Sequence, residues 1–182
     1  PYSMCDEGNV KLIRFLAEDG RVLYGCPEKS RPGEARIIHG DLFGEFQVGD
    51  ERVGVRQVLP PLVPTNILAV GLNYRRHADE TGLKTSADPV LFMKATTSVI
   101  GPGDTILLPL AGPRRVEYEA ELAVIIGKKG KNIDLSHAMD HVFGYTCSND
   151  VSARDWQMER QSNQWVRGKS FERTAAFFIF FW

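Results

Sequence analysis

Three glutamates stand at alternate positions directly before a short apolar run. Glu117, Glu119 and Glu121 lead into residues 122–126, which are rich in β-branched residues and are closed by Gly127. This pattern predicts a buried strand on which alternate side chains share one face, with neighbouring carboxylates about 6.5 Å apart. Like charges so close to a core repel each other and resist desolvation, and a hard divalent cation relieves both effects. The alternative is a solvated acidic edge without a metal.

Two pairs of residues that include histidine have spacings that could carry other chemistry. His77 and Glu80 are three residues apart on a predicted short helix, so they can touch. A carboxylate beside an imidazole raises its basicity, as a general base for water requires. The alternative is an ordinary surface pair. His137 and His141 have the i,i+4 spacing of a zinc pair, but no third nitrogen or sulfur ligand is near them in the sequence, which favours a solvated helix face.

Two further charged residues stand at positions where functional groups are common. Asp150 follows an apolar strand and precedes a predicted helix, a placement shared by many functional carboxylates. Taken alone, it is more typical of a turn or of a capping residue. Lys169 follows Gly168, and by itself it predicts only a solvated lysine.

Short strands and a few short helices are expected to position these groups. Two β-prone runs flank Asp19-Gly20 and predict a hairpin, and Gly82 is expected to end a helix that Asn73 caps. The fold class is therefore mostly β with short helices, an α+β protein. The expected strands are 11–17, 21–25, 66–71, 90–94, 98–100, 122–127 and 144–148, and the expected helices are 73–82, 135–141 and 152–160.

A proline-rich segment divides the chain. Residues 59–64 read Leu-Pro-Pro-Leu-Val-Pro, and prolines favour extended backbone and interrupt ladders. We therefore expect a small N-terminal domain over residues 1–60 and a second domain from residue 61.

Composition excludes several classes of partner. The net charge is -1 and no stripe of lysine and arginine is present, so no nucleic-acid partner is expected. No apolar run approaches the roughly 20 residues that span a bilayer, so no membrane partner is expected either. Residues 1–10 lack the basic and apolar regions of a secretory signal. The expected compartment is the cytoplasm, with the mitochondrion as the alternative.

Five phrases, in order and at the right spacing, resemble the fumarylacetoacetate hydrolase family. Together they cover about residues 60–171, and the preceding region suits the small N-terminal domain of that family. The phrases are Gly-Leu-Asn-Tyr-Arg-Arg-His at 71–77, Leu-Phe-Met-Lys at 91–94, Tyr-Glu-Ala-Glu-Leu-Ala-Val-Ile-Ile-Gly-Lys at 118–128, Gly-Tyr at 144–145 with Asn-Asp-Val-Ser-Ala-Arg-Asp-Trp-Gln at 149–157, and Gly-Lys-Ser-Phe at 168–171.

The resemblance implies a mixed β-sandwich roll that binds Mg²⁺, or Mn²⁺ or Ca²⁺ in its place, and forms homodimers. The phrase at 150–157 resembles members that act on small oxo-acids. The metal ligands implied are Glu119, Glu121 and Asp150, so that Glu117 drops out of the acidic set.

The resemblance also implies roles for six other residues. His77 and Glu80 match the water-activating pair of the acylpyruvase-type members, and Lys169 supports the metal site or the substrate. These three residues are the expected catalytic set. The residues expected to bind or line the substrate site are Lys94, Arg154 and Gln157.

The implied reaction is hydrolysis of a carbon–carbon bond in a small 2-oxo, 1,3-dicarbonyl acid. A chelated oxo-acid has a polarised carbonyl, and the enolate formed on cleavage is stabilised by the metal. The same enolate serves isomerisation, decarboxylation or tautomerisation, which are the alternative activities. The exact substrate is left open.

The chain departs from the family pattern after Phe171. The family continues with further strands and a substrate loop, whereas residues 172–182 end in the apolar, mostly aromatic run Phe-Phe-Ile-Phe-Phe-Trp. We expect an incomplete catalytic domain over 61–171 and an aberrant hydrophobic tail over 172–182. The second hypothesis is therefore a truncated chain that binds metal without turnover.

Overall fold

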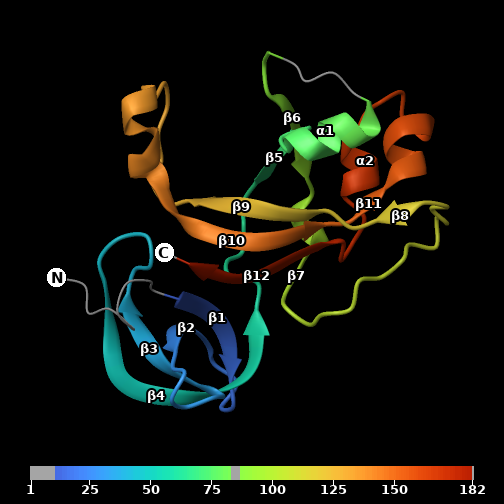
Figure 1. Ribbon diagram of the computed structural model, residues 1–182. Helices are drawn as coiled ribbons and strands as arrows, with labels where there is room; N and C mark the ends of the chain where they lie inside the picture. The colour runs from blue at the N-terminus through green and yellow to red at the C-terminus, as the bar shows by residue number, and fades with distance from the viewer. Residues whose placement is uncertain (1–10, 83–86, 182) are drawn as a thin grey trace.

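The computed structural model describes residues 11–82 and 87–181, and strands dominate it (Figure 1). This confirms the mostly-β prediction with short helices. The strands are β1 (Lys11–Ala17), β2 (Val22–Pro27), β3 (Glu34–Gly40), β4 (Phe46–Leu59), β5 (Ile67–Gly71), β6 (Val90–Lys94), β7 (Val99–Ile100), β8 (Val116–Glu117), β9 (Ala120–Ile126), β10 (Val142–Asp150), β11 (Ser152–Ala153) and β12 (Ala175–Phe181). The helices are α1 (Arg75–Thr81) and α2 (Val166–Lys169), the 3₁₀ turns η1 (Thr96–Ser98) and η2 (Leu135–His141), and the π-helical turn η3 (Trp156–Arg160). No helix of this described part is long and apolar enough to cross a membrane.

The first four strands pair in a closed antiparallel ring, seen at the bottom of Figure 1. β1 pairs with both β2 and β4, and β3 joins β2 to β4. The hairpin predicted at Asp19-Gly20 is confirmed, because Gly20 has φ +87° and the Asp19 carboxylate accepts the Arg21 N–H at 3.0 Å. Inside the ring, Ile13, Phe15, Ala17 and Ala35 form a buried cluster.

A second group of strands carries the acidic residues. The main sheet has the order β2-β3-β4-β1-β12-β10-β9, and β7 pairs with β12 in parallel. β5 with β6 and β8 with β11 form separate two-stranded sheets. β9 therefore lies at one end of the main sheet, and its only ladder partner among the described strands is β10.

Residues 175–181, within the segment expected to be an aberrant hydrophobic tail, form a strand inside the main sheet. β12 lies between β1 and β10, with Lys11 opposite Phe181 and Asp150 opposite Ala175. Aromatic and β-branched residues favour strands, and the run of such residues here continues a ladder rather than hanging free.

The N-terminal ring and the later strands share a core. Leu12, Cys26, Leu42 and Ile125 form one buried cluster, and Leu62 and Phe143 are among the partly buried residues that pack against it. β4 ends at Leu59, next to the predicted boundary. The proline-rich segment therefore follows the ring, while β1, β12 and this cluster connect the two regions.

Two helix predictions need correction. Asn73 caps nothing: α1 begins after Tyr74, whose backbone is extended, and no side chain caps it. The predicted end at Gly82 is confirmed by its left-handed backbone, with φ +64°. Ser152 does not begin a helix, because it lies in β11 and its hydroxyl donates to the carbonyl oxygen of Asp150 at 3.0 Å.

Candidate metal and substrate site

Three carboxylates meet where β9 and β10 lie side by side. Glu121 is on β9, Glu119 directly precedes β9, and Asp150 ends β10. The antiparallel register sets Glu121 opposite Ser148, and the Asp150 N–H donates to the Glu119 carbonyl oxygen at 2.9 Å. One carboxylate oxygen from each of the three residues lies within 4.8 Å of the others, the one such group of acidic, histidine or cysteine ligands found in the described residues. The implied ligand set is therefore brought together.

Glu117 is separated from this group, as the resemblance implied. It lies on β8, which pairs with β11 and not with β10, so that Glu117 is opposite Ser152. The single strand predicted for all three glutamates is broken between β8 and β9. The even spacing along one strand was therefore the wrong basis for grouping them.

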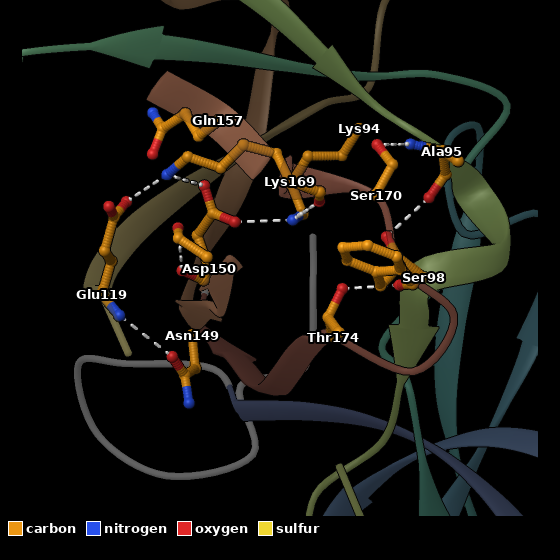
Figure 2. A network of polar contacts seen from close by, with 12 residues as sticks. Lys94, Ala95, Ser98, Glu119, Asn149, Asp150, Gln157, Lys169, Ser170 and Thr174 are labelled. Atoms are coloured by element: carbon orange, nitrogen blue, oxygen red, sulfur yellow. Dashed lines mark hydrogen bonds and ion pairs between the residues drawn. The ribbon is translucent and has the colours of Figure 1, made fainter. Parts of the chain in front are cut away.

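Two buried lysines neutralise the carboxylates (Figure 2). Lys169 Nζ lies 2.7 Å from Glu119 Oε2 and 2.9 Å from Asp150 Oδ2. Lys94 Nζ lies 2.5 Å from Asp150 Oδ1 and also donates to the carbonyl oxygen of Lys169. The Asp150 carboxylate is almost fully buried, and an ionised carboxylate in such a place requires cationic or hydrogen-bonding partners.

Arg154 contacts the Glu119 oxygen that Lys169 does not. Its Nη2 lies 2.6 Å from Glu119 Oε1, its Nε donates to Glu117 Oε2 at 2.8 Å, and its Nη1 donates to Gln157 Oε1 at 2.9 Å. Gln157 is almost fully buried in η3. The predicted substrate residues Lys94, Arg154 and Gln157 therefore all lie at or next to the three carboxylates.

The pKa values within the group are shifted in opposite directions. Burial, with the charges of Asp150 and Glu119, raises the pKa of Glu121 to about 7. Burial also acts to raise the pKa of Glu119, but Lys169 and Arg154 outweigh it and hold that pKa below its usual value. Burial lowers the pKa of Lys94, and the Asp150 carboxylate opposes the shift. Among the described residues, Glu121 is the one of the three carboxylates that forms no ion pair of its own, so a bound cation would favour its ionised form.

A glycine allows the two elements that carry Lys169 and Gln157 to touch. Gly168 of α2 packs against the η3 backbone, and a Cβ there would lie 2.6 Å from the Gln157 nitrogen. That distance is far below normal contact, so only glycine fits without a shift of backbone. Lys169 therefore reaches the carboxylates because its neighbour has no side chain.

An open cavity of about 760 Å³ reaches the carboxylates from one side. Lys94, Glu121 and Asp150 line its polar end. Much of the remaining wall is apolar and comes from β5 and β9, including Leu68, Val70, Leu122 and Val124. Mostly apolar walls with a few convergent polar groups are typical of small-molecule sites.

The predicted water-activating pair is only partly described. Glu80 is exposed on α1, while the side chain of His77 lies outside the described part of the chain. The N–H of Leu122 donates to the Tyr74 hydroxyl at 2.9 Å, which links the start of α1 to the strand that carries Glu121. The pairing of His77 with Glu80 stays a prediction.

His137 and His141 do not form a metal-binding pair with a third ligand among the described residues. His137 is exposed, and His141 Nδ1 lies 2.9 Å from the carbonyl oxygen of Lys128. Neither residue joins the group of potential metal ligands among the residues described.

Two contacts at the site, made by Asn149 and Glu117, were not predicted from the sequence. Asn149 Oδ1 accepts the backbone N–H of Glu119 at 3.2 Å and so helps to fix the backbone of one of the three carboxylate residues. Glu117 binds Arg154 instead of a metal. The adjacency of Asn149 to Asp150 was a usable signal for the first, but no local pattern indicates the second.

Comparison with known proteins identifies the family of the chain. Residues 66–177 match the family described as fumarylacetoacetate hydrolase, C-terminal. The chain belongs to the fumarylacetoacetate hydrolase family. The match spans the three carboxylates, both lysines and Arg154, so every charged residue of the site lies inside the family region.

Named relatives of the family include tautomerases and isomerases. An uncharacterised protein from Archaeoglobus fulgidus is 49% identical over 166 residues, or 90% of this chain and 60% of that protein. A mitochondrial oxaloacetate tautomerase from Xenopus laevis is 45% identical over 121 residues, or 66% of this chain and 38% of the relative. The structure of a 5-carboxymethyl-2-hydroxymuconate delta-isomerase from Mycobacterium smegmatis superposes with a TM-score of 0.78 at 33% identity, covering 92% of this chain and 64% of that one. The chain thus spans less than two thirds of the length of these family members.

Proposed function

We propose that this chain carries the metal-binding site of an enzyme that acts on small 2-oxo acids through an enolate. The observation that carries the proposal is the meeting of Glu119, Glu121 and Asp150, with carboxylate oxygens within 4.8 Å of one another. An all-carboxylate donor set suits a hard divalent cation, so Mg²⁺ or Mn²⁺ fits these residues, with Ca²⁺ as a further option. When bound, such an ion supplies a Lewis acid that polarises the carbonyl of the oxo-acid.

The charges around the site favour an anionic ligand. Lys94, Lys169 and Arg154 contact Asp150 and Glu119 at 2.5–2.9 Å. Glu121 has no ion pair among the described residues, and Glu117 shares Arg154, so three cations face four carboxylates. A divalent cation would therefore leave an excess of positive charge, which a dicarboxylate or the enolate of an oxo-acid would neutralise. This balance supports an acidic small-molecule substrate and gives no support to a neutral one.

The protein groups have separable roles in the proposed reaction. Arg154 and Gln157 orient the substrate, Lys94 and Lys169 hold Asp150 and Glu119 in place, and the apolar wall of the cavity limits the access of water. In the hydrolytic version, the His77–Glu80 pair removes a proton from water, which attacks the second carbonyl. The bond to the enolate carbon then breaks, and the enolate is protonated to the 2-oxo acid.

Isomerisation or tautomerisation is the second candidate, and the names of the relatives favour it. It needs only removal of a proton next to the carbonyl and its return to another atom, so it does not depend on an activated water. Both versions share the carboxylate group and differ in their use of His77 and Glu80. We also propose that the protein works as a homodimer, which light scattering of the purified chain would test.

The decisive experiment measures cation binding before activity. We expect purified chain to bind Mn²⁺ in calorimetry, and Glu119→Gln or Asp150→Asn to weaken binding by about 100-fold. Glu159→Gln should have no effect, because Glu159 is exposed and pairs with Arg114. Cation binding that both ligand variants retain would overturn the proposed site.

Activity assays then separate the candidate functions. The ultraviolet absorbance of enol oxaloacetate follows tautomerisation, and loss of acylpyruvate follows hydrolysis. Hydrolysis that His77→Ala abolishes while tautomerisation survives would support the first version. Tight Mn²⁺ binding with neither reaction would support the truncated, metal-binding alternative.

A further inference from the structure

Glu117 lies beside the metal group without belonging to it. Its carboxylate is about half exposed on β8, and it is not among the three carboxylates that come within 4.8 Å of one another. Its shorter hydrogen bond comes from Arg154 Nε at 2.8 Å, and Arg115 Nη2 lies 3.2 Å from its other oxygen. Hydrogen bonds from Arg154 and Arg115 hold the pKa of Glu117 below its usual value, so the carboxylate is ionised at neutral pH.

The guanidinium of Arg154 is divided among three acceptors. Nε faces Glu117, Nη2 faces Glu119, and Nη1 faces Gln157. An arginine prefers to bind one carboxylate with two parallel hydrogen bonds, and Nε with Nη2 is one of the edges that can do so. Because Glu117 holds Nε, Arg154 can offer Glu119 only one hydrogen bond.

This division matters because Arg154 and Lys169 would compete with a divalent cation for the oxygens of Glu119. Its Oε1 contacts Arg154 and its Oε2 contacts Lys169. A second hydrogen bond from Arg154 would occupy more of the lone pairs that a divalent cation needs. We propose that Glu117 is a positioning residue that restrains Arg154 and so keeps Glu119 available to a divalent cation.

The proposal rests on the proposed metal site, and two simpler explanations compete with it. Glu117 could favour a cation through its negative charge alone, or it could merely stabilise the β8–β11 pair. A charge effect acts whether or not Arg154 is present, and a stability effect appears without any metal. Only restraint of Arg154 requires both side chains.

A double-mutant cycle on Mn²⁺ binding separates these explanations. We expect Glu117→Gln to weaken Mn²⁺ binding by about tenfold, measured by calorimetry and by the electron paramagnetic resonance of free Mn²⁺. In an Arg154→Met background, the same substitution should change the dissociation constant by less than about twofold. Glu159→Gln is the matched control, because Glu159 also pairs with an arginine, Arg114, but touches none of the three carboxylates.

The outcomes are distinguishable. Wild-type affinity in Glu117→Gln, or an equal loss with and without Arg154, would overturn the inference while leaving the metal site intact. Loss of Mn²⁺ binding in Glu117→Gln together with a lowered melting temperature of the chelator-treated protein would also count against it, in favour of a structural role. Wild-type Mn²⁺ binding that is insensitive to Glu119→Gln would instead refute the metal site itself.

Discussion

At the scale of residues, the site depends on how unequally its three carboxylates are partnered. Both oxygens of Asp150 contact ammonium groups, and both oxygens of Glu119 contact cations. Glu121 has no such contact within ion-pair distance among the described residues, and its neighbours Asp150 and Glu119 are negative. Without a bound cation, ionisation of Glu121 is therefore less favourable than ionisation of Glu119.

The unfavourable ionisation of Glu121 should appear in the pH dependence of the unfolding free energy. The folded pKa of Glu121 is raised from 4.5 to about 7, so the folded protein holds this proton more tightly than the unfolded chain does. Its contribution to stability is complete below pH 4.5 and is lost as the pH rises towards and through about 7. We expect urea unfolding of chelator-treated protein to show this loss, and Glu121→Gln to remove it. Equal slopes for the wild type and the variant between pH 5 and 7 would contradict the assignment.

At the scale of elements, short contacts between distant segments bring the charged groups together. β9 and β10 carry the carboxylates, and α2 packs on η3 so that Lys169 and Gln157 flank them. Each segment is too short to be stable alone, so packing between segments must hold the geometry.

Gly168→Ala should test this contact. The added methyl group would lie 2.6 Å from the Gln157 nitrogen, which forces α2 and η3 apart. We expect a loss of about 1–3 kcal/mol in unfolding free energy, the usual cost of overpacking, with weaker Mn²⁺ binding because Lys169 moves. Gly54→Ala is the control, since its methyl group would meet only the flexible Glu18 side chain, at 3.1 Å. Equal losses for the two variants would show that the α2–η3 contact has no special role.

The sequence predicted some of these elements and not others, for physical reasons. The apolar run after Glu121 identified β9, and the Asp-Gly turn identified the first hairpin, because both signals are local. The grouping of Glu119, Glu121 and Asp150 followed from the family phrases. The Arg154–Glu117 contact depends on pairing of β8 with β11, which no local pattern encodes. η3 falls within the helix expected over 152–160, but the first residues of that range form β11, whose pairing with β8 is not a local signal.

At the scale of the whole molecule, apolar side chains remain exposed along β5, β6 and β9. Leu68, Leu91, Leu122 and Ile126 each expose 60–69% of their surface, and Val124 exposes 49%. Contiguous exposed apolar surface is uncommon on soluble monomers and favours association or dye binding.

Polar substitutions on this face should change its behaviour without unfolding the protein. We expect Leu68→Lys with Val124→Lys to reduce the fluorescence of a bound hydrophobic dye and to raise the concentration at which light scattering appears. The melting temperature should change little, because both side chains are exposed. Val22→Lys, at a similarly exposed (51%) position on the N-terminal ring, is the control and should affect neither readout. If the double substitution leaves the dye fluorescence unchanged, the dye-binding surface lies elsewhere on the protein.

The position of β12 also has a consequence for the order of folding. The ring strands β1 to β4 are close neighbours along the chain, so they can associate after short loop closures. The ladder from β1 to β12 joins Lys11 to Phe181 and must wait for a closure of nearly the whole described chain. Because closing long loops is slow, the ring should form early and the strand beside Asp150 should dock late. Assembly of the three clustered carboxylates is then tied to the slowest step of folding.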